Sequence, residues 1–130
     1  MPADPRPIAV AVVVHAGRVL VGRRPTMAAE AAGRAEFPGG KVEPGETSAA
    51  AAARECLEEA GVAIRVLDRS VTVADRATIR FHWATPLDPA AAPRAPFAWI
   101  PVADLAARDF PAANAPVLAL LREGPAHGGS

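Results

Sequence analysis

The chain has 130 residues and carries 14 basic and 14 acidic side chains, so its formal net charge is zero. This length suits one domain with its own core. Because basic residues do not outnumber acidic ones, the composition argues against a nucleic-acid polymer as partner. A single cysteine rules out a disulfide framework and fits a reducing compartment. The apolar run near the N-terminus is too short to cross a membrane. We therefore expect a cytoplasmic monomer with one domain over residues 1–124 and a disordered tail over 125–130.

The N-terminal part of the chain predicts a β-hairpin. Residues 8–14 are rich in β-branched side chains, which favour a buried strand, and residues 19–22 predict the second arm. Arg23 and Arg24 follow directly. Adjacent arginines at a strand end usually lie on solvated surface, although a guanidinium in this place also suits recognition of a phosphate or sugar.

A helix is predicted from Ser48 to Ala60, because this segment contains no glycine or proline and is dominated by alanine, the best helix former. Thr47 or Ser48 can cap its start, and Gly61 stands where a C-terminal cap glycine belongs. The apolar side of this helix is predicted to consist of Ala49, Ala53, Cys56, Leu57 and Ala60.

The remaining predicted elements are shorter. Strands are expected at residues 63–67, 70–73, 78–84 and 97–100, a loop at 87–96, a short helical piece at 104–107 and a last helix at 115–122. His82 lies between two large aromatic residues in the third of these strands. We interpret it as a structural rather than a catalytic histidine.

Three carboxylates share one face of the predicted helix. Glu55, Glu58 and Glu59 fall within an arc of roughly 100°, since residues i, i+3 and i+4 lie on the same side. Their mutual repulsion is best neutralised by a hard cation such as Mg²⁺, which binds carboxylates together with substrate phosphates. The alternative is a solvated acidic face, the better explanation for an arbitrary helix. Other residues stand at fixed intervals around the carboxylates, and this pattern argues against a merely solvated face. They are Gly39, Gly40, Glu46 and Arg54.

The stretch from Gly40 to Val62 reads GKVEPGETSAAAAARECLEEAGV. It resembles the Nudix box, G-x5-E-x7-R-E-U-x-E-E-x-G-U with U an apolar residue, at every specified position, Cys56 being the first apolar residue. The resemblance implies an α/β fold, a Nudix-type α/β/α sandwich with a mixed curved sheet between helices. It also implies Mg²⁺- or Mn²⁺-dependent hydrolysis of nucleoside diphosphate derivatives. In that family pattern the metal ligands would be a backbone carbonyl of the Gly39–Gly40 pair with Glu55, Glu58 and Glu59, while Arg54 and Glu46 brace the loop and the helix.

Two further segments resemble the MutT-type branch of the family, whose members remove oxidised guanine nucleotides. They are EFPGGKVEPGE, which leads into the box, and FPAANAPV at residues 110–117. The resemblance implies that Arg24 contacts the substrate and that the Asn114 amide reads the base edge. Asn114 could instead be the N-cap of the last helix. Phe37 is either a core residue or a ring that contacts the base.

The chain departs from the MutT-type pattern at Ala98, because an acidic residue that assists the metal or the attacking water is expected there, before Trp99. The general base is therefore open, and a carboxylate of the box could take its place. The expected reaction converts a nucleoside triphosphate, such as 8-oxo-dGTP, into a nucleoside monophosphate and pyrophosphate. The alternatives are a CTP, modified-pyrimidine or broad dNTP pyrophosphohydrolase, and a nucleotide-binding sensor without turnover. In each case the expected partner is a small nucleotide, with no nucleic-acid polymer and no membrane.

Overall fold

The computed structural model describes residues 6–23 and 34–123. Its elements are β1 (Ile8–His15), β2 (Arg18–Arg23), β3 (Ala35–Glu36), β4 (Gly39–Lys41), α1 (Ser48–Ala60), β5 (Ile64–Asp75), β6 (Ala77–Pro86), β7 (Phe97–Pro101) and α2 (Ala115–Glu123), with 3-10 turns at Val102–Asp104, Ala107–Asp109 and Ala112–Asn114. Arg24 and the tail at 125–130 lie outside the described residues. In the described part of the chain, no helix has the length and apolar character needed to cross a membrane.

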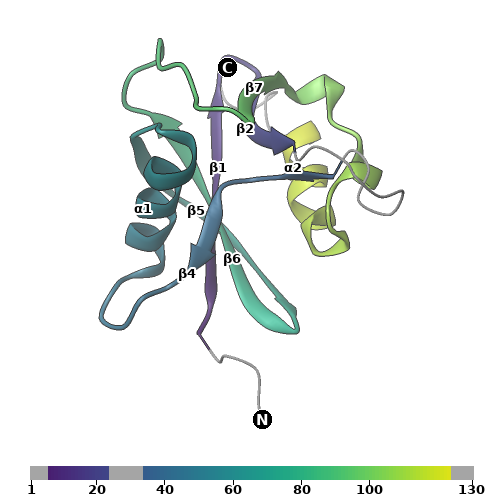
Figure 1. The fold of residues 1–130 in the computed structure, drawn as a ribbon. Coiled ribbons are helices and arrows are strands. Elements are labelled where there is room, and N and C mark those ends of the chain that lie inside the picture. Colours follow the sequence, from purple (N-terminus) through teal and green to yellow (C-terminus); the bar gives the residue numbers. More distant parts are fainter. Residues whose placement is uncertain (1–5, 24–33, 124–130) are drawn as a thin grey trace.

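The strands form one mixed sheet. Its main path is β3-β2-β1-β6-β5, while β4 also pairs with β1 and β7 with β2. β1 and β6 run parallel, and every other pair is antiparallel. Figure 1 shows α1 on one side of this sheet and α2 on the other. The α/β sandwich with a mixed sheet that the sequence predicts is therefore confirmed.

The central strand β1 separates two cores, because its side chains alternate between the two faces of the sheet. Val10 and Val12 belong to the cluster that contains the buried residues of α2. Ala9, Ala11 and Val13 belong to the cluster that contains those of α1. The α1 side is built from smaller residues, so this helix lies close to the sheet.

The ends of α1 are capped as the sequence predicts. The Thr47 hydroxyl accepts a hydrogen bond of 3.1 Å from the Ala50 N–H. Gly61 has a φ of 71°, and its N–H donates to the Leu57 carbonyl at 3.0 Å. Only glycine adopts this left-handed backbone at low cost. Both ends are therefore fixed by local chemistry that can be read from the sequence.

The predicted apolar side of α1 was wrong at Leu57, whose side chain is 52% exposed. Cys56 and Ala60 are fully buried, as predicted, and so are Ala51 and Ala52, which the prediction left out. Alanine occupies so many positions that periodicity cannot orient this helix. The face of α1 that packs against β1 has room for alanine but not for leucine. This packing decides how α1 is rotated about its own axis.

His82 is structural, as expected. Its Nε2 atom shares a hydrogen bond of 2.7 Å with the Ser48 hydroxyl at the start of α1, and the residue is only 5% exposed. Burial, together with the positive charge of Arg80, lowers the pKa of His82. The neutral imidazole thus links β6 to α1.

Three predicted segments differ in detail. The two strands expected at 63–67 and 70–73 form one strand, β5, whose ladder to β6 is irregular between Val66 and Ser70. Instead of one helical piece at 104–107, two 3-10 turns flank these positions. The loop at 87–96 is tied to the C-terminal end of α1, because the Arg94 N–H donates to the Ala60 carbonyl at 2.8 Å and its guanidinium donates to the Glu58 carbonyl at 2.7 Å.

Candidate active site

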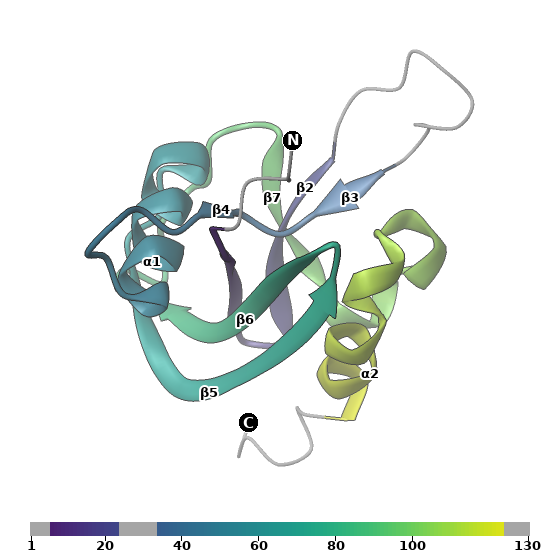
Figure 2. The ribbon, with the colours of Figure 1, turned by 90° about the horizontal axis from the view of Figure 1, so that it is seen from below.

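The candidate site lies where β4 runs beside α1, as Figures 1 and 2 both show. Gly39 and Gly40 pair with Val10 and Ala9 of β1, so the backbone of the glycine pair is fixed by the sheet. The chain then turns through residues 42–47 into α1. This arrangement holds a strand backbone without side chains against the acidic face of the helix.

Arg54 joins the turn to the helix. Its Nε and Nη2 atoms donate to the two carboxylate oxygens of Glu46 at 2.8 and 2.9 Å, and Nη2 also donates to the Lys41 carbonyl at 3.2 Å. Glu46 in turn accepts a hydrogen bond of 3.0 Å from the Glu43 N–H. The side-chain hydrogen bond from Arg54, followed by that from the Glu43 backbone, lowers the pKa of Glu46 to about 2. This bidentate ion pair therefore keeps both its charges around neutral pH.

The three carboxylates of the helix do not occupy equivalent places. Glu59 accepts a hydrogen bond of 3.1 Å from the Gly39 N–H. The Glu55 carboxylate lies so close to Gly40 that any side chain on that residue would collide with it, and it also accepts from Arg54 Nη1 at 3.1 Å. Glu58 points outward, with its side chain 58% exposed and 3.4 Å from the same guanidinium. The structure thus brings Glu55 and Glu59 to the glycine pair and leaves Glu58 apart.

A fourth carboxylate, Glu36, belongs to the same neighbourhood. Burial raises the pKa of Glu59, the N–H of Gly39 opposes this rise, and the negative charges of Glu55 and Glu36 add to it. In the sequence Glu36 is part of EFPGGKVEPGE, and no role was predicted for it. Its position directly before the glycine loop, at the end of a strand, is the signal that could have pointed to it.

The donor chemistry of this region fits a divalent cation. Carboxylate and carbonyl oxygens are the ligands that Mg²⁺ and Mn²⁺ prefer. The pKa of Glu59 is raised mainly by burial and further by the negative charges of Glu55 and Glu36, which a cation would offset. In residues 6–23 and 34–123, however, no three His, Cys, Asp or Glu side chains form a ready metal site. The reason is visible in the contacts, since Arg54 holds Glu55 and Glu58 while Gly39 holds Glu59. A cation would have to compete with Arg54 for two of these carboxylates.

A cavity of about 260 Å³ opens beside Glu36 and is lined by Arg34, Ala35, Glu36 and Pro111. It lies between two segments that are joined by the rings of Phe37 and Phe110, whose centroids are 5.1 Å apart. Small-molecule sites usually have about 300–1,000 Å³, so this cavity could take part of a ligand. It places the start of the MutT-like segment at 110–117 next to Glu36.

Asn114 lies in the segment that forms one wall of this cavity. It is only 8% exposed, and its N–H donates to the Pro111 carbonyl at 3.0 Å. Its side-chain amide makes no hydrogen bond within the described residues. Because none of the fully buried side-chain polar atoms described here lacks a partner, the polar atoms of this amide keep at least a small contact with solvent. A side-chain bond that would make Asn114 the N-cap of α2 is therefore not seen.

The other predicted residues have different surroundings. Phe37 is 6% exposed and packs in the core with α2, which agrees with the core alternative. Arg24 lies outside the described residues, but its neighbour Arg23 forms an exposed ion pair of 3.3 Å with Asp109. Ala98 is exposed on β7, opposite Val21 of β2, and supplies no carboxylate.

The two glycines of the site predict opposite outcomes for the same substitution. In Gly39→Ala the new methyl group would meet the Ala9 carbonyl oxygen at 2.6 Å, a backbone atom that cannot move, so we expect a loss of about 1–3 kcal/mol of stability. In Gly40→Ala the nearest atoms would be those at the flexible end of the Glu55 side chain, so we expect a stable protein with roughly a hundredfold lower activity. Thermal unfolding and turnover, measured on both variants, check this. Equal effects of the two substitutions would contradict it.

Comparison with known proteins identifies the family of this chain. The sequence profile of the NUDIX domain matches residues 5–121. The chain is 32% identical to the 8-oxo-dGTP diphosphatase of Escherichia coli strain K12 over 122 residues, which are 88% of this chain and 95% of the relative.

Solved structures agree as well. A MutT NUDIX hydrolase from Burkholderia pseudomallei is 30% identical, with a TM-score of 0.58 over 80% of this chain and 88% of that one. A NUDIX hydrolase from Nitrosomonas europaea shares the fold, with a TM-score of 0.79 at 20% identity over 96% of this chain and 74% of that one. The chain therefore belongs to the NUDIX family of hydrolases.

Proposed function

We propose that this hydrolase converts a nucleoside triphosphate into a nucleoside monophosphate and pyrophosphate, and that it acts preferentially on oxidised purine nucleotides such as 8-oxo-dGTP. The observation that carries the proposal is the cavity bounded by Glu36 and Pro111. It lies between Glu36, three residues before Gly39, and Pro111, three residues before Asn114. The relative from Escherichia coli named 8-oxo-dGTP diphosphatase, 32% identical, supports the same substrate.

The proposed cofactor is Mg²⁺ or Mn²⁺. Glu55, Glu58, Glu59 and the carbonyl of Gly40 would hold it, since all four offer hard oxygen donors and two of them, Glu55 and Glu59, already lie at the glycine pair. A divalent ion supplies neutralisation of the phosphate charge and a lower pKa for an attacking water. Arg54 holds α1 and the preceding turn together through its ion pair with Glu46. The helix therefore stays in place when Glu55 and Glu58 exchange their contacts with Arg54 for contacts with a cation.

The remaining tasks fall to the chain itself. Ala98 leaves no carboxylate at the place where the MutT-type pattern has one, so an acidic residue near the glycine pair would take the proton of the attacking water. The Asn114 amide, whose donor and acceptor make no hydrogen bond within the described residues, is suited to read the edge of a base. Arg24 would contact the phosphate or sugar. We place the enzyme in the cytoplasm, where its free buried Cys56 stays reduced.

The proposal is tested by pyrophosphate release in the presence of Mg²⁺, with 8-oxo-dGTP, dGTP, CTP and dCTP compared as substrates. Glu58→Gln, prepared in parallel, controls for a contaminating phosphatase. A strong preference for 8-oxo-dGTP is expected. A preference for CTP would favour the pyrimidine alternative, and equal rates on all triphosphates would favour a broad dNTP enzyme. Nucleotide binding without any turnover would contradict the proposed reaction and favour a sensor.

A further inference from the structure

We propose that Arg94, in the loop between β6 and β7, is a positioning residue of the candidate site. It holds the last turn of α1, and with it the Glu58 and Glu59 carboxylates, in the place where a divalent cation would bind. Arg94 acts through the backbone of the helix and touches neither the cation nor the substrate. The inference rests on the metal dependence in the proposed function, but not on which nucleotide is hydrolysed.

The last turn of α1 needs support from outside the helix. The last four carbonyls of an α-helix, here those of residues 57–60, have no partner within the helix. This turn carries Glu58 and Glu59 and no basic side chain. Negative charge is unfavourable at the C-terminus of a helix, where the helix dipole is itself negative. The end of α1 that bears two of the proposed metal ligands is therefore prone to fray.

Arg94, which lies 36 residues after Glu58 in the chain, supplies this support. Its guanidinium Nη1 atom donates to the Glu58 carbonyl at 2.7 Å, and its backbone N–H donates to the Ala60 carbonyl at 2.8 Å. The guanidinium also lies against Gly61, where an added methyl group would meet the Nη2 atom at 3.2 Å. One residue thus binds two of the carbonyls that the helix leaves without a partner, and it places a positive charge at the negative end of the helix dipole.

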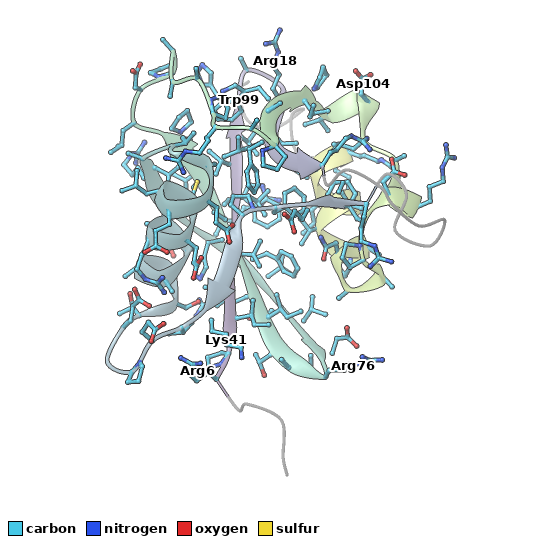
Figure 3. The ribbon with its side chains drawn as sticks, in the orientation of Figure 1. Arg6, Arg18, Lys41, Arg76, Trp99 and Asp104 are labelled. Carbon is cyan, nitrogen blue, oxygen red and sulfur yellow. The ribbon has the colours of Figure 1, made fainter. Side chains whose placement is uncertain are left out.

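The loop that carries Arg94 is itself fixed to the sheet. The N–H of Phe97, the first residue of β7, donates to the Arg94 carbonyl at 2.9 Å. The Trp99 indole, also on β7, donates to the Ala91 carbonyl at 3.1 Å. Figure 3 shows Trp99 at the same end of the molecule as the C-terminal end of α1. Because β7 pairs with β2, these contacts connect the last turn of α1 to the sheet through Arg94.

The last turn of α1 is held at two points. The Glu59 carboxylate accepts from the Gly39 N–H at 3.1 Å, while Arg94 holds the backbone of the preceding residue, Glu58. Glu55, one turn earlier, lies at the glycine pair without help from Arg94. If the second point is lost, the last turn can move relative to Glu55, and the carboxylates no longer face one cation together. Residues that orient metal ligands typically change metal affinity or activity by about 10–100-fold when they are replaced.

The test is binding of Mn²⁺ to the full chain without nucleotide, followed by the electron paramagnetic resonance signal of free Mn²⁺. Arg94→Ala should raise the Kd for Mn²⁺ by about tenfold or more. Arg94→Lys keeps the positive charge and one donor for the Glu58 carbonyl but loses the planar fork, so it should recover part of the affinity. The Mg²⁺ concentration that gives half-maximal pyrophosphate release should follow the same order, with little change in KM for the nucleotide at saturating Mg²⁺.

Trp99→Phe is the matched control, because it removes the other side-chain hydrogen bond of the loop and leaves the contacts of Arg94 with α1 in place. It should lower the melting temperature, measured with a chelator, but not the affinity for Mn²⁺. Equal effects of Trp99→Phe and Arg94→Ala on Mn²⁺ binding would show that loop stability alone matters, and they would overturn the inference.

The possible outcomes separate this inference from the proposed function. An enzyme that releases pyrophosphate, with an Arg94→Ala variant that binds Mn²⁺ as tightly as the wild type, would overturn the inference alone. A wild type whose Mn²⁺ affinity depends on Arg94, but which hydrolyses no nucleotide, would support the inference and contradict the proposed reaction. A wild type that binds no Mn²⁺ would overturn both.

Discussion

Glu59→Gln is expected to lower kcat by about a hundredfold to a thousandfold, the usual cost of removing one group that stabilises charge in a transition state. Among the three box carboxylates, Glu59 is the one fixed by the backbone of the glycine pair, through the Gly39 N–H at 3.1 Å. The amide oxygen of glutamine can keep this hydrogen bond, so the geometry should survive while the negative charge is lost. Pyrophosphate release with Mg²⁺, measured on both proteins, checks the loss.

The same variant should be as stable as the wild type, or more stable, at neutral pH without divalent cations. Burial and neighbouring carboxylates raise the pKa of Glu59 above its ordinary value of 4.5. A carboxyl group whose pKa is raised by folding contributes no cost below about pH 4.5, and costs stability as pH rises through the folded-state pKa. Glutamine has no such cost. The variant should therefore exceed the wild type in stability only above about pH 4.5.

Thermal unfolding of Glu59→Gln and the wild type at several pH values, with a chelator present, tests this sign. Glu123→Gln is the matched control, because Glu123 is an exposed carboxylate at the end of α2. It should change neither activity nor stability. A Glu59→Gln protein that loses stability at neutral pH would mean that the carboxylate mainly supports the fold.

Local chemistry explains why so much of α1 could be predicted. The capping hydroxyl of Thr47, the left-handed Gly61 and the run of good helix formers all act within one or two turns of the chain. The alternation of β1 side chains between the two faces of the sheet is likewise set by local backbone geometry. The rotation of α1 about its axis depends on β1, however, and an alanine-rich sequence carries no periodic signal for it. This is why Leu57 was placed on the wrong side.

The candidate site shows the same division. Helical spacing correctly places Glu55, Glu58 and Glu59 on related faces of α1, but it treats them as equivalent. Their different surroundings come from contacts with Arg54 and with the Gly39–Gly40 backbone. The role of Glu36 and the cavity beside it depend on the contact of Phe37 with Phe110, which are far apart in sequence. Contacts between residues so far apart in the chain cannot be read from a local sequence pattern.

The loop at 87–96 illustrates a missed signal. Its composition offers little reason for order, yet Arg94 binds two carbonyls at the C-terminal end of α1, and the Trp99 indole donates to the Ala91 carbonyl at 3.1 Å. Basic side chains commonly satisfy the last carbonyls of a helix. Arg94 is the one charged residue between Asp88 and Pro96, so it was the natural candidate for this contact.

Asn114→Ala is expected to reduce kcat/KM for the preferred purine nucleotide by about tenfold to a hundredfold, since a bidentate contact to a base edge is worth about 1–3 kcal/mol. The loss should be much smaller for CTP and dCTP, so the substrate preference should narrow. Asn114→Asp is the informative companion, because it keeps the size and one acceptor of the side chain but removes the amide donor. Steady-state kinetics with 8-oxo-dGTP, dGTP and CTP on all three proteins measures the change.

Stability separates this role from that of a helix cap. Loss of an N-cap side chain costs about 1 kcal/mol, and it would affect all substrates alike through the fold. Because the Asn114 amide makes no hydrogen bond within the described residues, its removal should cost well under that amount. An alanine variant that is clearly destabilised while keeping its preference among nucleotides would identify Asn114 as a cap. An unchanged melting temperature with a narrowed preference would instead assign base recognition to a side chain that folding leaves without a partner.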